Sequence, residues 1–441
     1  MNRKPSNSPL AKVVIIGGGW SGLAAACQLA PYTDVTLLEA APQLGGRARA
    51  VYWQEDCIDN GQHLFLGAYH HTYSLLKNIG LSVNQFFHTM PFQWQSHGAT
   101  ERIHFALSML KKLPWLSLKG LQLREKISLL WALNTLRKPL PHSQHQTTVL
   151  QFLKKFRQSP KLIQHFWQPL CEAALTTPVE SAAMPVFHQV MHQAFGSDLS
   201  ASDYWIPSQN LSKLLPEPAH HFLISQGAKV HLNQRVQRLC IEGDRCTGVW
   251  SKEIFYPAQQ IILATPYQQT CALLQPYTNC HTLCESLKHL APAQISTLYL
   301  RFSKPITTSL PFFHIQAPLP FWVFNRLHCQ QPDLLALVFS QTQPLLQDEA
   351  ALLNMVMPWL RSVLPDLPAP IASKLIREKR GAFEATLFAE QHRPTLQTPI
   401  SNVLLAGDYV ANGYPACLEG AVLNGTRCSE RTLASFAILP Q

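Results

Sequence analysis

Hydrophobic and polar positions over the first forty residues follow a strand, a turn, a helix and a second strand in succession. Residues 13–16 are a continuous apolar run, which is typical of a parallel strand buried on both faces. Glycines at 17–19 predict the turn that follows this strand. Apolar positions from 23 to 29 predict a helix with a small-residue face, and residues 35–38 predict the next buried strand.

The β pattern returns in the second half of the chain and again near its end. The predicted strands are 230–232, 236–239, 249–250, 261–264, 298–302, 335–339 and 403–406, with a hairpin turn at Gly243 and Asp244. Helices are predicted near 348–364 and from 419 to 427, and the periodicity between 101 and 161 is helical apart from a polar interruption at 139–148. Strands that alternate with helices in this way predict an α/β fold.

A glycine motif of the form G-x-G-x-x-G joins the first predicted strand to the first predicted helix. The first glycine of such a motif permits a tight turn, the second lets the backbone approach a pyrophosphate, and the third lets helix and strand pack closely. Amides at the helix N-terminus then face the phosphates, and an acid at the end of the second strand accepts hydrogen bonds from a ribose. The predicted dinucleotide-binding residues are Gly17, Gly19, Trp20, Ser21, Gly22 and Glu39.

Two further segments resemble the amine oxidase and phytoene desaturase superfamily of flavoproteins. Leu44–Gly45–Gly46–Arg47 is similar to its second signature, and the stretch from Leu404 to Ala421 is similar to its closing flavin motif. The resemblance implies that the dinucleotide is FAD, that Arg47 supports its phosphate and ribose, and that Asp408 meets its ribityl or pyrophosphate portion. The further FAD residues implied are Gly45, Gly46, Arg47, Val236, Gly407, Asp408, Glu419, Gly420 and Ala421, with the last helix directing its N-terminus at the flavin ring.

Other motifs narrow this resemblance. They are Asp59–Asn60–Gly61–Gln62–His63, Gly67–Ala68–Tyr69, Pro169–Leu170–Cys171, the stretch from Ala173 to Pro178, and Ala201–Ser202–Asp203 before Pro207. Together they resemble the squalene-associated FAD-dependent desaturases, the hydroxysqualene dehydroxylase family of hopanoid synthesis, over residues 12–432. One position departs from the pattern, because Thr176 stands where the family has an asparagine.

The resemblance implies a reductive reaction on a C30 isoprenoid. Its members replace the allylic hydroxyl of hydroxysqualene with hydrogen, with reduced FAD as the implied electron source, so an acid must assist the departure of water. His63 is the first candidate acid, and Asp203 and Tyr414 are weaker ones. Gly61, Gln62 and His63 are also expected beside the cofactor, where His63 could equally be a hydrogen-bonded neighbour with no catalytic role.

Two other functions stay open. A carotenoid or phytoene desaturase would oxidise a similar polyene, although it lacks the stretches around 60–63 and 175–178. An amine-oxidising flavoprotein would have an aromatic pair and often a lysine at the flavin, whereas Tyr414 alone lies near the closing motif. No second nucleotide motif is apparent, so the source of electrons for FAD is open.

Charge is concentrated in one segment of the chain. The 441 residues carry a net charge of +10, and residues 101–161 contain 12 basic and 2 acidic side chains, so the remainder is neutral. The basic residues alternate with Leu, Phe and Trp, among them Phe105, Trp115, Leu118, Leu121 and Trp131. A basic amphipathic segment of this kind favours an anionic membrane surface over nucleic acid, because its aromatic residues lie among leucines and do not form a stacking platform. The alternative is an ordinary amphipathic helix that covers the substrate domain.

The remaining composition points to a cytoplasmic protein. The 11 cysteines are scattered, which is typical of reduced thiols, and Cys280, His281, Cys284 and His289 lack a paired-cysteine spacing, so we expect no metal site. The N-terminus lacks a signal-peptide pattern, and no stretch is apolar enough to span a bilayer. We therefore expect a cytoplasmic enzyme held peripherally on the inner face of the membrane, close to upstream enzymes of squalene synthesis.

The predicted fold class is α/β, an amine oxidase-like flavoprotein of two interleaved domains. A Rossmann-like FAD-binding domain would take residues 8–60, 215–268 and 385–441. A mixed α+β substrate domain would take 61–214 and 269–384, with 101–161 as its membrane-facing segment.

Overall fold

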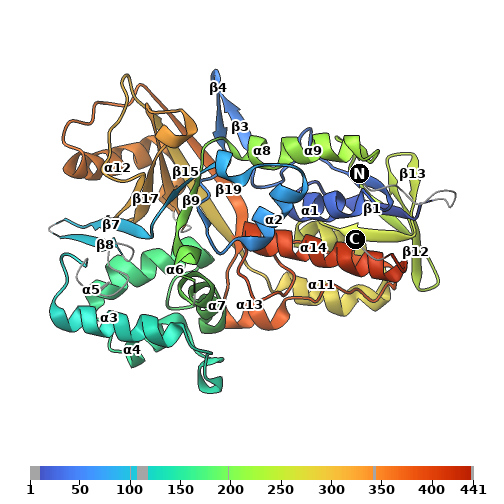
Figure 1. Ribbon diagram of the computed structural model, residues 1–441, viewed down its shortest axis with the longest axis horizontal. Helices are drawn as coiled ribbons and strands as arrows, with labels where there is room; N and C mark the ends of the chain where they lie inside the picture. The colour runs from blue at the N-terminus through green and yellow to red at the C-terminus, as the bar shows by residue number, and fades with distance from the viewer. Residues whose placement is uncertain (1–9, 100, 107–117, 197, 341–343, 439–441) are drawn as a thin grey trace.

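The first predicted strand lies at the centre of a five-stranded parallel sheet in a computed structural model, which describes residues 10–99, 101–106, 118–196, 198–340 and 344–438. The strands, in spatial order, are β10 (Lys229–His231), β2 (Asp34–Leu38), β1 (Lys12–Ile16), β14 (Gln260–Leu263) and β20 (Val403–Leu405). Segments from both ends and from the middle of the chain therefore meet in one sheet (Figure 1).

Both faces of this sheet are covered. The surrounding elements are α1 (Trp20–Leu29), α2 (His70–Asn78), α9 (Pro216–Ser225), α10 (Tyr267–Leu274), α11 (His281–Lys288), α14 (Leu418–Ser435) and the sheet β11 (Arg238–Glu242), β12 (Arg245–Ser251) and β13 (Ile254–Pro257). Val13 and Ile15 pack with α1 and α9, whereas Val14 and Ile16 pack on the opposite face with β12 and α11. Because side chains alternate along a strand, a continuous apolar run is needed to fill both interfaces.

A second, seven-stranded sheet forms the other half of the molecule. Its order is β19 (Ala372–Phe383), β15 (Pro292–Arg301), β18 (Leu334–Phe339), β17 (Phe321–Asn325), β16 (Phe312–Ile315), β7 (Gln93–His97) and β8 (Arg102–Ala106). Neighbouring strands are antiparallel except for β16 and β7. The helix α12 (Glu349–Val363) covers one face, where its apolar side chains pack with those of β15, β17 and β18.

A group of helices lies against the other side of the strands β7, β8, β16 and β17 (Figure 1). Its main members are α3 (Leu123–Leu136), α4 (Val149–Lys155), α6 (Gln168–Leu175) and α7 (Met184–Phe195). Smaller strands connect the two halves: the hairpin β3 (Ala50–Trp53) and β4 (Asp56–Asp59), and the sheet β5 (Phe65–Leu66), β9 (Tyr204–Pro207) and β6 (Phe87–Met90). None of the helices in the described ranges is long and apolar enough to cross a bilayer.

The segment 101–161 differs from its prediction in two ways. Residues 102–106 form the strand β8 instead of a helix, because β7 supplies the hydrogen-bonding partner that a local pattern does not reveal. Phe105, Leu118 and Leu121 are buried in the core and cannot face lipid, whereas Trp131 is exposed. The predicted lipid-facing residues from 107 to 117, Trp115 among them, lie outside the described residues.

Candidate active site

A cavity of about 680 Å³ extends from the turn between β1 and α1 to the aromatic residues of β7, β16 and β17. Its volume lies within the range of small-molecule and cofactor sites. One half is lined by backbone, glycine and charged groups, and the other by aliphatic and aromatic side chains.

The glycine turn brings the N-terminus of α1 to the polar half of the cavity. Gly17 has a φ of +104°, and a Cβ on Gly22 would lie only 2.0 Å from the carbonyl oxygen of Gly17, so the helix can start this close to the strand only with glycine there. Gly19 is the N-cap of α1 and no side chain caps this helix. The hydroxyl of Ser21 is buried at the same place without a protein hydrogen-bond partner. These free donors at a positive helix end fit the pyrophosphate of FAD.

The acid at the end of β2 is held in place by backbone amides. The two carboxylate oxygens of Glu39 accept hydrogen bonds from the amides of Gly18, at 2.6 Å, and Ala41, at 2.7 Å. Each oxygen keeps a second lone pair, so the carboxylate can also accept hydrogen bonds from a ribose. Glu39 lines the cavity, and its geometry therefore fits its predicted role.

Arg47 joins three segments that are distant in sequence. Its Nη2 donates to Asp408 Oδ2 at 2.6 Å, and its Nη1 donates to the carbonyl oxygens of Arg380 and Gly381 at 3.2 and 2.9 Å. Arg47 follows the glycines of the second signature, Gly381 belongs to β19, and Asp408 follows β20. The three segments meet at the cavity wall, which both Arg47 and Asp408 line.

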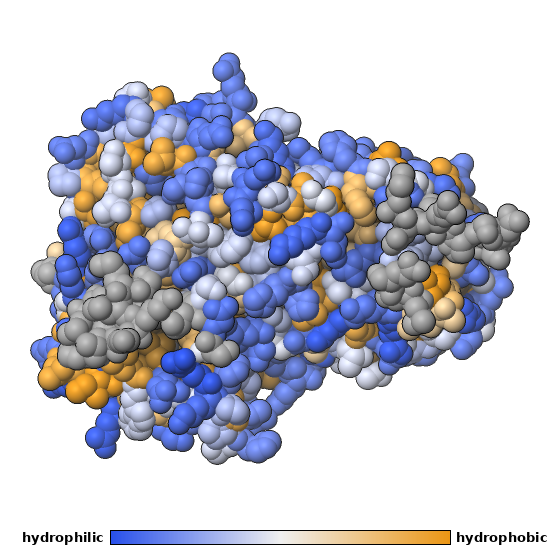
Figure 2. Space-filling model, in the orientation of Figure 1, coloured by the Kyte–Doolittle hydropathy of each residue, from blue (hydrophilic) through white to orange (hydrophobic). Residues whose placement is uncertain are grey.

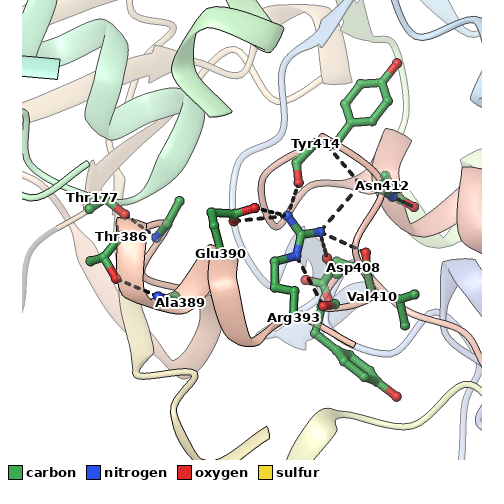
Figure 3. Close-up of polar contacts among 12 residues, drawn as sticks. Thr177, Thr386, Ala389, Glu390, Arg393, Asp408, Val410, Asn412 and Tyr414 are labelled. Atoms are coloured by element: carbon green, nitrogen blue, oxygen red, sulfur yellow. Dashed lines mark hydrogen bonds and ion pairs between the residues drawn. The ribbon is translucent and has the colours of Figure 1, made fainter. Parts of the chain in front are cut away.

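A second arginine, which sequence reasoning missed, fixes the loop after β20. The guanidinium of Arg393, just after α13 (Leu387–His392), is completely buried and pairs with both carboxylate oxygens of Glu390 at 3.1 Å (Figure 3). It also donates to carbonyl oxygens of the loop, those of Asp408 (3.0 Å), Tyr409 (3.2 Å), Val410 (2.8 Å) and Tyr414 (2.6 Å). One side chain thus shapes the loop that carries Asp408 and Tyr414.

The segment from Asp59 to His63 is held by a buried polar network. Asp59 and Arg326 form an ion pair at 2.8 Å, and Arg326 also donates to Gln62 Oε1 at 2.9 Å. The amide nitrogen of Gln62 in turn donates to the hydroxyl of Tyr299 at 2.6 Å. Arg326 and Tyr299, which the sequence did not single out, therefore orient the residue that precedes His63.

His63 lines the cavity with one ring nitrogen already engaged. Its Nδ1 lies 3.2 Å from the carbonyl oxygen of Gly61, so Nδ1 carries the proton in the neutral ring and Nε2 has the free lone pair. Burial lowers the pKa of His63 below its usual value, and Asp59 opposes this shift only in part. The neutral form therefore dominates at neutral pH.

The other two candidate acids occupy different places. Tyr414 lines the cavity, its hydroxyl is hydrogen-bonded to the side chain of Gln193, and burial raises its pKa to about 12, so the phenol stays protonated. Asp203 follows a 3-10 turn outside the residues that line the cavity, and its carbonyl oxygen accepts the amide of Gly67. Of the three candidate acids, only His63 and Tyr414 therefore line the cavity.

The predicted FAD residues differ in their positions. Those that line the cavity are Gly17, Gly19, Trp20, Ser21, Glu39, Gly45, Gly46, Arg47, Gly61, Gln62, His63, Val236, Gly407, Asp408 and Ala421. Gly22, Glu419 and Gly420 are not among the residues that line the cavity. The Glu419 carboxylate is fully buried and accepts the amides of His71 and Thr72, at 2.8 and 3.0 Å, at the start of α2. Glu419 therefore joins α14 to α2. The amides at the start of a helix have no partner within that helix, and two of them hold this carboxylate away from the cavity.

The second half of the cavity is apolar. Phe92 stacks on Tyr204, Tyr204 contacts Phe312 edge to face, and Trp322 contacts Trp94 in the same way, which gives a continuous aromatic wall. Helices α6 and α7 close the opposite side with Leu170, Ala173, Ala174, Val190, Met191, Ala194 and Phe195. Among the described residues of this half, none has a charged side chain.

The aromatic wall was not predicted, although part of its signal is present in the sequence. Phe92 and Trp94, and likewise Trp322 and Phe324, are aromatic residues two positions apart, so each pair faces one side of a strand. The alternate residues of β17, Phe321 and Val323, pack against α12 on the other side of the sheet. What the sequence does not reveal is that β7 and β17 flank the same strand, β16.

The cysteine and histidine residues near 280 have other partners. Cys280 and Cys284 are buried among apolar side chains of α10 and α11. The ring of His281 lies 3.1 Å from the carbonyl oxygen of Gln275, and that of His289 contacts Phe388. Within the described ranges, no three His, Cys, Asp or Glu side chains are placed to hold a metal ion.

Comparisons with known proteins agree with this geometry. The model of the family described as flavin containing amine oxidoreductase matches residues 20–433. A hydroxysqualene dehydroxylase of Sinorhizobium fredii is 25% identical over 96% of this chain and 98% of its own. A 15-cis-phytoene desaturase of Glycine max is 22% identical over 97% of this chain and 80% of its own.

The fold has counterparts among solved structures. An oxidoreductase from Methanosarcina mazei aligns with a TM-score of 0.77 and 15% identity, covering 95% of this chain and 100% of that one. Together with the family match, this likeness confirms the predicted fold class, an α/β flavoprotein fold with a parallel and a largely antiparallel sheet.

Proposed function

We propose that this chain, which belongs to the family of flavin containing amine oxidoreductases and is an FAD-dependent oxidoreductase, reductively removes the allylic hydroxyl of hydroxysqualene to give squalene. The polar half of the cavity would hold FAD through the amides at the start of α1, the hydroxyl of Ser21, and the side chains of Glu39, Arg47 and Asp408. When bound and reduced, FAD supplies a hydride.

The uncharged aromatic half of the cavity carries this proposal. A charged amine would lose its hydration in this half, and the described residues there offer no carboxylate to pair with it. A C30 hydrocarbon, in contrast, gains free energy from each methylene that leaves water for such a wall. The aromatic faces would also stabilise the positive charge that develops on an allylic carbon when its hydroxyl departs.

The reaction balances with one proton from the protein. Breaking the C–O bond would release hydroxide, which would take a proton to become water, and reduced FAD would supply the hydride for the new C–H bond. His63 is proposed to give this proton from Nε2, after which solvent returns it. Tyr414, protonated at neutral pH, would donate a hydrogen bond to the departing oxygen from another part of the cavity wall.

The chemistry of the substrate also bears on the protein's location and partners. A C30 isoprenoid resides in lipid, so we place the protein at the inner face of the cytoplasmic membrane as a peripheral protein. The net charge of +10 in residues 101–161 supports attraction to anionic lipids. Enzymes that produce hydroxysqualene would be its functional partners.

The test is a parallel assay of two substrates. The enzyme loaded with FAD is offered hydroxysqualene with the flavin reduced anaerobically, and phytoene with the flavin oxidised. We expect squalene from the first reaction and no product from the second. Formation of desaturated phytoene with reduction of the flavin would instead identify the protein as a desaturase. Its similarity to the Glycine max enzyme makes this the alternative to test.

A further inference from the structure

The helix α3 has an exposed apolar stripe on its outer face. Leu123, Ile127 and Trp131 are four residues apart, so they share one face of the helix, and they are 63%, 60% and 53% exposed. Figure 2 shows the resulting apolar patch at the lower left of the molecule, over α3. The other large exposed hydrophobic residues of the described chain occur singly, except for the neighbours Ile254 and Phe255 on β13, so the stripe is a local feature.

Basic side chains surround this stripe. Arg124 lies on its flank and is exposed, as is Lys138 just beyond the end of α3. Trp131 packs edge to face on Phe156, with ring centroids 4.8 Å apart, and this contact brings the end of α4 beside the stripe. Exposed basic side chains therefore continue from the tryptophan end of the stripe: Lys154, Lys155 and Arg157.

The two acids of the region do not offset this charge at the stripe. Glu125 is buried, where it accepts hydrogen bonds from the amide of Gln122 at 2.9 Å and the hydroxyl of Ser159 at 2.7 Å. Glu101 is paired with Lys161 at 3.1 Å. The face around the stripe is consequently apolar at its centre and positive at its rim.

The same helix contacts the wall of the substrate cavity. Nε and Nη2 of Arg137, directly after α3, donate to the carbonyl oxygen of Gly196 at 3.2 and 2.9 Å. Gly196 follows Phe195, the last residue of α7, which lines the apolar half of the cavity. Contact between α3 and a bilayer would therefore also keep the apolar half of the cavity near that bilayer.

We propose that the stripe Leu123, Ile127 and Trp131, with its basic rim, is a docking surface for an anionic lipid bilayer. The apolar side chains would enter the boundary between headgroups and acyl chains, and the rim would lie against lipid phosphates. The charge pattern selects this partner, because a protein-binding surface of ordinary composition has few lysines and more aromatic area at its centre. The inference rests on the proposed function only for the reason that a lipid-dissolved substrate would make such docking useful.

The experiment is vesicle flotation with the holoenzyme. The vesicles are phosphatidylcholine alone or phosphatidylcholine with phosphatidylglycerol, each at low and high salt. The apolar variant is Leu123→Gln/Ile127→Gln/Trp131→Gln, and its matched control, Ile224→Gln/Leu327→Gln/Ile371→Gln, removes side chains of similar exposure elsewhere. The charge variant is Arg124→Gln/Lys154→Gln/Lys155→Gln, matched by Lys304→Gln/Arg361→Gln/Lys374→Gln.

We expect the wild-type holoenzyme to bind the anionic vesicles and to release them at high salt. The apolar variant should bind at least tenfold more weakly, the charge variant roughly fivefold more weakly per residue removed, and both controls like the wild type. Flavin absorbance and circular dichroism establish that each variant is folded. Failure of the wild type to bind either vesicle, or equal binding by the apolar variant and its control, would overturn the proposal.

Two further results separate this inference from others. If the wild type sediments as a dimer that the apolar variant converts to a monomer, a second copy of the chain covers the stripe and the lipid proposal is wrong. Vesicle binding without turnover of hydroxysqualene would overturn the proposed function and leave the docking surface intact. Turnover of hydroxysqualene with no vesicle binding would overturn the docking surface and leave the proposed function intact.

Discussion

At the scale of single residues, the cavity sets the protonation state of its candidate acids. His63 uses Nδ1 to hold the Gly61 carbonyl oxygen, and burial keeps its pKa below the usual value. A general acid must carry its proton before the leaving group departs. His63 is therefore ready to act in the smaller, protonated fraction, and this fraction grows as the pH falls.

This leads to a prediction for the pH dependence of turnover. The rate should be highest at acid pH and should decline as the pH rises through the lowered pKa of His63, since the protonated ring is lost there. His63→Asn, whose side-chain amide can still reach the Gly61 carbonyl, should lower kcat by roughly 10²–10⁴-fold while FAD stays bound. Stopped-flow rates across the acid range test both effects. Unchanged turnover in the variant would remove His63 from the mechanism.

Thr176 illustrates how one departure from a family pattern has a backbone explanation. It ends α6 in the left-handed conformation, with a φ of 51°. Asparagine tolerates this conformation better than a β-branched residue does. The family's asparagine is thus understandable as the residue that ends this helix.

Replacing Thr176 with asparagine should therefore stabilise the protein. The expected gain in the free energy of unfolding is about 1 kcal/mol, because the strain of a β-branched residue in the left-handed region is relieved. Thr176→Val serves as the control and should give no gain. Urea denaturation of the three proteins measures the difference, and a loss of stability in the asparagine variant would contradict the explanation.

At the scale of elements, the site depends on loops that distant elements hold in place. The loop after β20 takes its shape from Arg393, and the turn after β2 is joined to β19 and to the same loop by Arg47. A buried guanidinium with several carbonyl partners fixes backbone that has no regular hydrogen bonding of its own. FAD affinity should therefore depend on an arginine outside the cavity lining.

Arg393→Met tests this dependence. The change leaves Glu390 and four carbonyl oxygens without their donor, so we expect at least tenfold weaker FAD binding and a loss of about 3–5 kcal/mol in the free energy of unfolding. Glu390→Gln, which keeps the carbonyl contacts, should have a smaller effect on FAD. Fluorescence titration of the apoprotein measures affinity. Equal affinity in Arg393→Met and wild type would show that the loop holds its shape unaided.

The elements also show what local sequence can and cannot predict. The turn at Gly17 to Gly22 was predictable because its constraints are local steric ones. Residues 102–106 were predicted as helical and form a strand, because their partner β7 is a tertiary feature. Glu419 was expected at FAD, yet its carboxylate caps α2, an element about 350 residues earlier in the chain. The boundaries of the two interleaved domains stay a prediction.

At the scale of the whole molecule, one cavity joins a polar half, which carries the predicted FAD residues, to an apolar half. The first half follows from glycine and charge motifs that are readable in sequence, whereas the second arises only when β7, β16 and β17 bring their aromatic residues together. The family resemblance pointed to an isoprenoid substrate, and the shape of the apolar half gives that expectation a physical basis.

Filling the apolar half should separate substrate binding from cofactor binding. Ala194 on α7 is buried and lines this half, so Ala194→Trp would occupy space needed by a long hydrocarbon. We expect a rise of at least tenfold in KM, or loss of turnover, with FAD content and absorbance unchanged. Ala194→Ser, which keeps a small side chain at this position, is the control and should behave like the wild type. Normal turnover in the tryptophan variant would mean that the substrate binds elsewhere.

The central claim, reductive dehydroxylation by bound FAD, is tested most directly in a single turnover. Enzyme with stoichiometric FAD is reduced, freed of excess reductant, and mixed with hydroxysqualene without oxygen while flavin absorbance and products are followed. We predict that the flavin is reoxidised and that one squalene forms per flavin, at a rate that falls when His63 is replaced. A flavin that stays reduced in the presence of hydroxysqualene would contradict the account.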